Sequence, residues 1–123
     1  MTITQATLTI EQYFADNYTY VEVDYLSPSF TPVGTQWLQL SIAPVISNII
    51  SVNNCSEEYF DIHLVGYGGN KVEASSAVDE AIALIRTKNI DDIRVKTWRT
   101  NASGVEESGT YFHKVIMECV SRN

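Results

Sequence analysis

The feature that most constrains this fold is a strict alternation of side-chain character from Tyr59 to Tyr67. Phe60, Ile62 and Leu64 fall on one side of an extended chain, and the residues between them fall on the other. A period of two residues is typical of a β-strand with one face in a core. The same alternation recurs, so that further strands are predicted in Tyr18 to Tyr25, Trp37 to Ile42, Ile93 to Arg99 and Thr110 to Val120.

The second face of these predicted strands carries large aromatic residues, where small polar residues are the usual choice. The aromatic residues on this phase are Tyr20, Trp37, Tyr59, Tyr67 and Trp98, and the charged residues Glu22, Asp61, Arg94 and Lys96 lie among them. A mixed aromatic and charged face favours contact with a partner protein. The alternative is that the first helix or the long loops of the same chain cover it. We predict a subunit interface made of Tyr20, Trp37, Tyr59, His63, Tyr67, Arg94, Lys96 and Trp98.

Two segments show helical periodicity. Thr7 to Asp16 predicts a short helix, and Lys71 to Lys88 predicts a long one with a narrow, alanine-rich apolar stripe. The residues of that stripe are Ala74, Ala77, Val78, Ala81, Ile82 and Ile85. The order of elements predicts an α+β fold in one domain over residues 1–123. We expect a mainly antiparallel, mixed sheet of four to five strands, with one long and one short helix packed on one face.

The chain is acidic, with 15 Asp and Glu residues against 8 Lys and Arg residues and a formal net charge of -7. This charge opposes binding to phosphate backbones and to anionic membranes unless basic residues cluster. The densest basic stretch is Arg94, Lys96 and Arg99 on one predicted strand, so sequence-directed nucleic-acid binding is not expected. Neither a membrane span nor a secretory pattern is visible, so we expect Cys55 and Cys119 to stay thiols in a cytosol.

Few residues are candidates for catalysis. His63 and His113 are the only histidines, and Asp61 shares a strand face with His63, but no nucleophile is identifiable beside them. Gly66 to Asn70 is rich in glycine and precedes the long helix, yet it lacks the spacing of a nucleotide-binding motif. No metal-ligand spacing is present either. We therefore expect no catalytic residues, no metal and no cofactor.

The run Phe30-Thr-Pro-Val-Gly-Thr-Gln-Trp37-Leu-Gln-Leu-Ser-Ile42-Ala-Pro44, followed by a strand, a glycine turn and a long alanine-rich helix, resembles the tail terminator proteins of long-tailed bacteriophages. The order of elements resembles that family over nearly the whole chain. The resemblance implies a homohexameric ring of α+β subunits, without catalytic activity or cofactor, that caps the tail tube and stops its polymerisation. Such a ring belongs to the virion tail, is assembled in the host cytoplasm, and offers a surface to the neck proteins of the head.

The resemblance also suggests roles for the loops. Leu26 to Gly34, Val45 to Ser56 and Thr100 to Gly109 are candidate docking loops for the tail tube protein and the neck protein. The residues that we single out there are Phe30, Val33, Ile49, Ile50, Val105, Glu106 and Glu107. The acidic balance would let DNA pass through a channel without specific binding.

Two other functions stay open. The nearest is another neck or tail-completion protein. The alternative from a different class is a small-ligand-binding or hydrolytic domain that uses Asp61 and His63.

Overall fold

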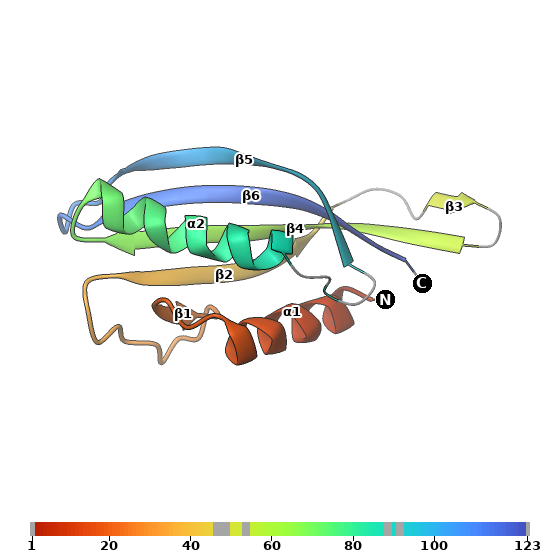
Figure 1. The fold of residues 1–123 in the computed structure, drawn as a ribbon, viewed down its shortest axis with the longest axis horizontal. Coiled ribbons are helices and arrows are strands. Elements are labelled where there is room, and N and C mark those ends of the chain that lie inside the picture. The colour runs from red at the N-terminus through yellow and green to blue at the C-terminus, as the bar shows by residue number, and fades with distance from the viewer. Residues whose placement is uncertain (1, 46–49, 53–54, 88–89, 91–92, 123) are drawn as a thin grey trace.

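The structure of this protein is a computed structural model, which describes residues 2–45, 50–52, 55–87, 90 and 93–122. The elements in these ranges are α1 (Ile3–Asn17), β1 (Glu22–Asp24), β2 (Trp37–Pro44), β3 (Ile50–Val52), β4 (Cys55–Gly68), α2 (Lys71–Thr87), β5 (Ile93–Val105) and β6 (Tyr111–Arg122) (Figure 1). This is an α+β fold, which confirms the predicted class.

The strands form one mixed sheet in the order β1-β2-β4-β6-β5, and β3 pairs with the first residues of β4. β1 and β2 run parallel, whereas β4 is antiparallel to β2, β3 and β6, and β5 is antiparallel to β6. A parallel pair needs a long crossover connection. The proline-containing segment Leu26 to Gly34 lies in that crossover. The predicted sheet, mainly antiparallel but mixed, is therefore confirmed.

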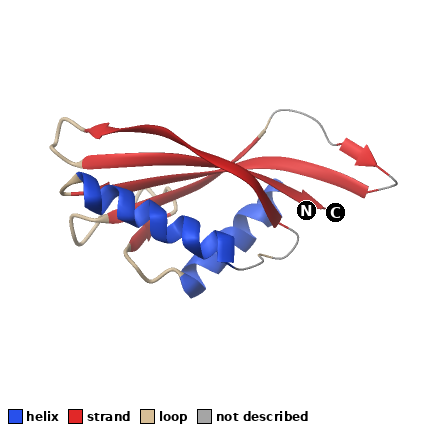
Figure 2. Ribbon diagram, turned by 45° about the horizontal axis from the view of Figure 1, so that its top comes forward, coloured by secondary structure: helices blue, strands red, loops and turns tan. Residues whose placement is uncertain are grey.

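Both helices pack on the same face of the sheet (Figure 2). The strand residues on that face are almost completely buried, namely Leu38, Leu40, Phe60, Ile62, Leu64, Val115, Met117 and Cys119. The register brings them together, because Leu40 lies opposite Leu64 and Leu64 lies opposite Val115. Burying one large apolar side chain contributes about 1.5–3 kcal/mol. This layer therefore fixes which face of the sheet is inside.

Helix α1 is longer than the sequence pattern predicts, because a capping box starts it at Ile3. The hydroxyl oxygen of Thr2 accepts from the Gln5 backbone N–H at 3.2 Å, and the Gln5 side chain accepts from the Thr2 backbone N–H at 2.8 Å. Its buried residues Ala6, Ile10 and Phe14 follow helical spacing. With 15 residues against 17 in α2, α1 is not the short helix that we expected.

Helix α2 lies very close to β4 at a glycine. The predicted stripe is buried except for Ile82, which is partly buried, and Gly66 of β4 faces the stripe. A Cβ atom at Gly66 would overlap the carbonyl oxygen of Ala74 and would lie 2.9 Å from Cγ2 of Val78. At the end of α1, the Tyr18 hydroxyl donates to the Ala77 carbonyl oxygen at 2.8 Å and joins the two helices.

Several strand boundaries differ from the predictions. β1 contains only three residues, although the alternation predicts a strand from Tyr18 to Tyr25. β5 continues to Val105, although the polar segment Thr100 to Gly109 predicts a loop. Residues with low intrinsic strand preference are held there by pairing with β6, because tertiary context outweighs β-propensity. Part of the predicted extension over Val45 to Val52 lies outside the described residues.

Replacing Gly66 by Ala should destabilise the fold, because the added methyl group has no space between β4 and α2. Overpacking of this kind costs about 1–3 kcal/mol in free energy of unfolding, which urea denaturation would measure. Gly34→Ala is the matched control, since a Cβ atom at Gly34 meets nothing within 4 Å. Equal stability of the two variants would show that Gly66 does not set the spacing between helix and sheet.

Candidate interaction surface

The sheet face opposite the helices presents alternate residues of β1, β2, β4, β5 and β6, and we call it the open face. On β1 these residues are Glu22 and Asp24, which lie beside Trp37 and Gln39 of β2. On β4 these residues are Tyr59, Asp61, His63, Val65 and Tyr67. Their cross-strand neighbours are Trp37, Gln39, Ser41 and Ala43 on β2, Phe112, Lys114, Ile116, Glu118 and Val120 on β6, and beyond these Arg94, Thr97, Arg99, Ala102 and Gly104 on β5. Neither α1 nor α2 packs on this face (Figure 2).

One row of the open face is aromatic across neighbouring strands. Trp37, Tyr67 and Phe112 occupy consecutive cross-strand positions. The rings of Trp37 and Tyr67 stack, with centroids 4.7 Å apart and an interplanar angle of 14°. Phe112 continues the row over Gly104 of β5, where a Cβ atom would lie 3.4 Å from the Phe112 ring. All three rings are partly exposed and present contact area to a partner.

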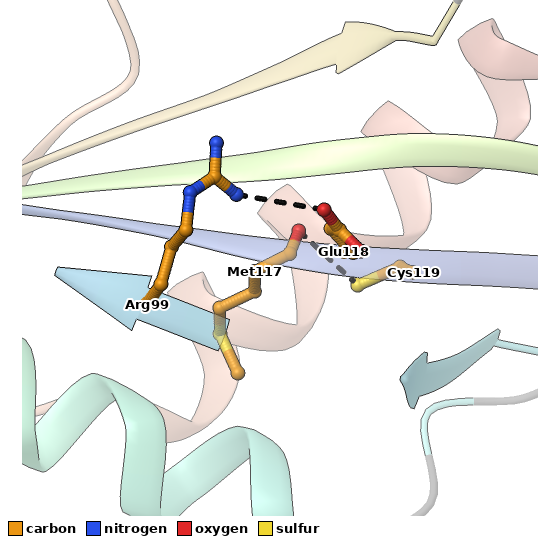
Figure 3. Close-up of polar contacts among 4 residues, drawn as sticks. All are labelled: Arg99, Met117, Glu118 and Cys119. Atoms are coloured by element: carbon orange, nitrogen blue, oxygen red, sulfur yellow. Dashed lines mark hydrogen bonds and ion pairs between the residues drawn. The ribbon is translucent and has the colours of Figure 1, made fainter. Parts of the chain in front are cut away.

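Charged side chains follow the aromatic row along β5 and β6. The Lys96 ammonium lies 4.9 Å from the centroid of the Tyr59 ring, which is a cation–π contact. Nη1 of Arg99 lies 3.5 Å from Oε1 of Glu118, on the side of the sheet away from the Met117 side chain (Figure 3). Because the two side chains are 57% and 50% exposed, this ion pair contributes little to stability. Both charges can therefore reorient toward a partner.

The open face carries charges of both signs. Four of the 8 basic residues lie on it, namely Arg94, Lys96, Arg99 and Lys114. The acidic residues that the structure describes on this face are Glu22, Asp24, Asp61 and Glu118. The basic residues are on β5 and β6, whereas Glu22 and Asp24 are on β1 at the opposite edge of the sheet.

Trp98 does not lie on the open face, which corrects the prediction from alternation. A β-bulge leaves Lys96 as an extra residue in β5 and shifts the alternation by one position. Trp98 consequently lies opposite Met117, whose side chain is in the core. Arg86 of α2 lies over the Trp98 ring, with Cζ 4.8 Å from the ring centroid. The predicted grouping of Trp98 with Trp37 is therefore wrong.

Tyr20 is also absent from the open face. Strand β1 begins only at Glu22, so Tyr20 lies in the connection after α1 and is 47% exposed. It lines a groove on the helix side together with Glu80 and Leu84 of α2. Of the predicted aromatic residues, Trp37, Tyr59 and Tyr67 are the ones that share the open face. Phe112 is also on this face, although it is not among the predicted interface residues. The alternation in Thr110 to Val120 was the signal for Phe112.

The predicted docking residues belong to opposite ends of the sheet. Phe30 and Val33 lie between β1 and β2, where Val33 is 93% exposed and its backbone N–H donates to the Glu22 carboxylate at 3.0 Å. Ile50 is the first residue of β3, at the other end of the sheet (Figure 1). Ile49 lies outside the described residues.

The third docking segment is a tight turn and not a long loop. Val105 is the last residue of β5, and Glu106 and Glu107 are exposed in the turn that follows. The Glu106 backbone N–H donates to the Thr110 carbonyl oxygen at 2.9 Å and closes the hairpin. This turn and the connection between β1 and β2 lie at the same end of the sheet (Figure 1).

The hydrolytic alternative depends on Asp61 and His63. Both residues lie on the open face, as predicted. Ser41 of β2 is directly opposite His63, which places a hydroxyl there that the sequence alone did not. Within the described part of the chain, however, Oδ1 of Asp61 is buried without a hydrogen-bond partner.

His113 and Cys119 project to the helix side of the sheet, away from the open face. His113 lines a cavity of about 400 Å³ with Lys71 and Tyr111. Burial, and secondly the Asp61 carboxylate, raise the pKa of the Cys119 thiol to about 12. Cys119 is a protonated, buried thiol, as expected, whereas the side chain of Cys55 lies outside the described part.

No described group of three His, Cys, Asp or Glu residues could hold a metal ion. The described helices are too short or too polar to cross a membrane.

Stability should depend on the titration of His63. Burial disfavours the imidazolium form and Lys114 repels it, so the pKa of His63 lies below its ordinary value of 6.5, although Asp61 partly opposes the shift. Below pH 6.5 the unfolded chain binds a proton on His63 before the folded chain does. This contribution to stability is present above pH 6.5 and is lost as the pH falls through the lowered pKa.

Replacing His63 by Gln removes this titration. The free energy of unfolding of wild type minus that of His63→Gln should decrease between about pH 7.5 and about pH 5. Chemical denaturation at a series of pH values measures this difference. A difference that does not change with pH would contradict the lowered pKa.

No protein-family model matches this chain, and no curated protein matches it either. The open face, with its aromatic row and its charges of both signs, is the strongest candidate for a functional surface. It is a broad face of a sheet and not a pocket, which suits a macromolecular partner better than a small molecule.

Proposed function

We propose that this protein is a structural ring subunit of the tail of a long-tailed bacteriophage. In this role it caps the tail tube, ends tube polymerisation, and offers a surface to the neck proteins of the head. The observation that carries the proposal is the open face, which combines partly exposed Trp37, Tyr67 and Phe112 with basic residues. The resemblance of the Phe30 to Pro44 run and of the order of elements to tail terminator proteins supplies the specific role.

The chemistry of the open face suits a subunit contact. Aromatic side chains and arginine are enriched at the centres of protein interfaces. Tyrosine and tryptophan bury much area with little loss of side-chain entropy. The stacked Trp37 and Tyr67 rings are already held in one arrangement. Such a pre-ordered pair loses less conformational freedom on binding than a flexible side chain does.

A ring needs a heterologous contact, in which the open face of one copy meets a different surface of the next copy. Such a heterologous contact gives a closed ring when the rotation that relates neighbouring copies brings the last copy into contact with the first.

The two ends of the sheet offer surfaces for the other partners. The β1–β2 connection and the β5–β6 turn lie at one end, and β3 lies at the other (Figure 1). A ring whose subunits contact each other through faces would leave these ends for the tail tube protein and the neck protein. The net charge of -7 disfavours adhesion of DNA to such a ring.

The first test is the mass of the protein in solution over a wide concentration range, by light scattering, with electron microscopy of the largest species. We expect a particle near six times 13.8 kDa with a central hole. A closed dimer, or an open filament in place of a ring, would contradict the proposal.

The second test replaces Trp37 by Glu. A charge in the aromatic row should raise the dissociation constant of self-association by about tenfold or more, because interface aromatic residues often contribute above 1 kcal/mol. Trp98→Glu is the matched control, since Trp98 is 39% exposed but lies on the other face of the sheet beside Arg86. Circular dichroism checks that both variants are folded. Normal assembly of folded Trp37→Glu would show that the open face is not a subunit contact.

A further inference from the structure

A groove on the helix side of the molecule lies between the end of α1 and the outer surface of α2. Its volume is about 300 Å³, and it is lined by Asn17, Tyr18, Thr19, Tyr20, Glu80, Ala83 and Leu84. Tyr18 forms a fixed wall, because its hydroxyl is bound to the Ala77 carbonyl oxygen at 2.8 Å. Tyr20 is exposed at the rim.

The groove is acidic and aromatic. Glu80 lines it, and the neighbouring Asp79 is exposed on the same helix. Burial, followed by the Glu80 carboxylate, raises the pKa of Tyr18, so the carboxylate is close to the buried phenol. A cation that entered the groove would find the Glu80 carboxylate and two tyrosine side chains in its lining. Carboxylates and aromatic rings are the two kinds of group that attract ammonium and guanidinium ions.

The same chain carries groups of the opposite charge on the open face. Lys96 is displaced outward by the bulge in β5 and lies over the ring of Tyr59. Arg94 is exposed two residues earlier on the same strand. These three residues form a basic and aromatic corner of the sheet, which we call the basic corner. Its charge is opposite to that of the groove.

Direct strand pairing at β5 is a less suitable contact. β5 is an edge strand of 13 residues, and long edge strands attract other strands. Two bulges interrupt its register, and Arg94, Lys96 and Arg99 are exposed along it. Bulges and charged side chains are the usual features that prevent edge-to-edge pairing. Contact through the side chains of the basic corner avoids that obstacle.

We propose that the groove between α1 and α2 receives the basic corner of a second copy of this chain, with Lys96 directed at Glu80. The inference rests on the proposed ring and names the two surfaces that meet in it. The groove and the basic corner lie on opposite faces of the subunit. When two copies meet, one uses its groove and the other its basic corner, so the pair still has one unused groove and one unused basic corner for further copies. This is the head-to-tail arrangement that a ring requires. Tyr20 then belongs to the interface through the groove, although it lies away from the open face.

A charge exchange tests this contact. Lys96→Glu and Glu80→Lys should each raise the dissociation constant of self-association by about tenfold or more, because each variant juxtaposes like charges. The double variant Lys96→Glu, Glu80→Lys restores an opposite pair and should return the dissociation constant to within about threefold of wild type. Sedimentation velocity at low and high salt measures all three, and salt should weaken wild-type assembly.

Matched controls separate this contact from net charge. Lys71→Glu and Glu107→Lys make the same changes of charge at exposed positions outside the groove and the basic corner, and they should leave the dissociation constant nearly unchanged. Folding of every variant is checked by circular dichroism.

The outcomes distinguish the inference from the proposed function. If wild type forms the ring and neither single variant weakens it, the inference is wrong and the ring proposal stands. If the double variant restores an assembly that is not a ring, the contact is right and the terminator role is wrong. A wild-type chain that stays monomeric at all accessible concentrations overturns the inference, because its partner is a second copy.

Discussion

Burial of one set of alternate side chains beneath α1 and α2 determines the rest of this structure. Once Leu40, Ile62 and Met117 face the helices, the residues between them must face the other way. The aromatic row and the basic residues are thus placed on the open face by the packing of the core. Gly66 is part of the same constraint, because it lets α2 lie close enough to cover β4.

The bulge at Lys96 changes this simple rule in β5. One extra residue turns Trp98 toward α2 and moves Lys96 outward over Tyr59. The same irregularity therefore has two effects. It places the Trp98 ring beside Arg86 on the helix side of the sheet, and it adds a cation to the open face. It also makes β5 a poor template for pairing with another strand.

Charges of both signs lie on both layers of the protein. Asp79 and Glu80 are exposed on α2 together with Lys71 and Arg86, and the open face carries acidic residues beside half of the basic residues of the chain. Opposite charges meet only in local pairings, such as the proposed one between Lys96 and Glu80. Such pairings attract copies of the same chain in a directional way that depends on salt. This is the physical basis on which the groove contact is proposed.

The sequence by itself determined the fold class, the two helices and the strands that alternate cleanly, because periodicity of two or 3.6 residues follows directly from burial of one face. It also determined that Trp37, Tyr59, His63 and Tyr67 share a face, since β4 and β2 keep a regular register. The sequence pattern did not predict that Thr100 to Val105 belong to a strand, because their polar side chains have a low strand preference and pairing with β6 holds them in place. Tertiary structure alone decided the side of Trp98, since a bulge depends on the partner strand. Tertiary structure also placed Ser41 opposite His63, Lys114 beside β5, and the end of α1 beside Glu80 in the groove. These residues are distant in sequence and become neighbours only in the folded chain.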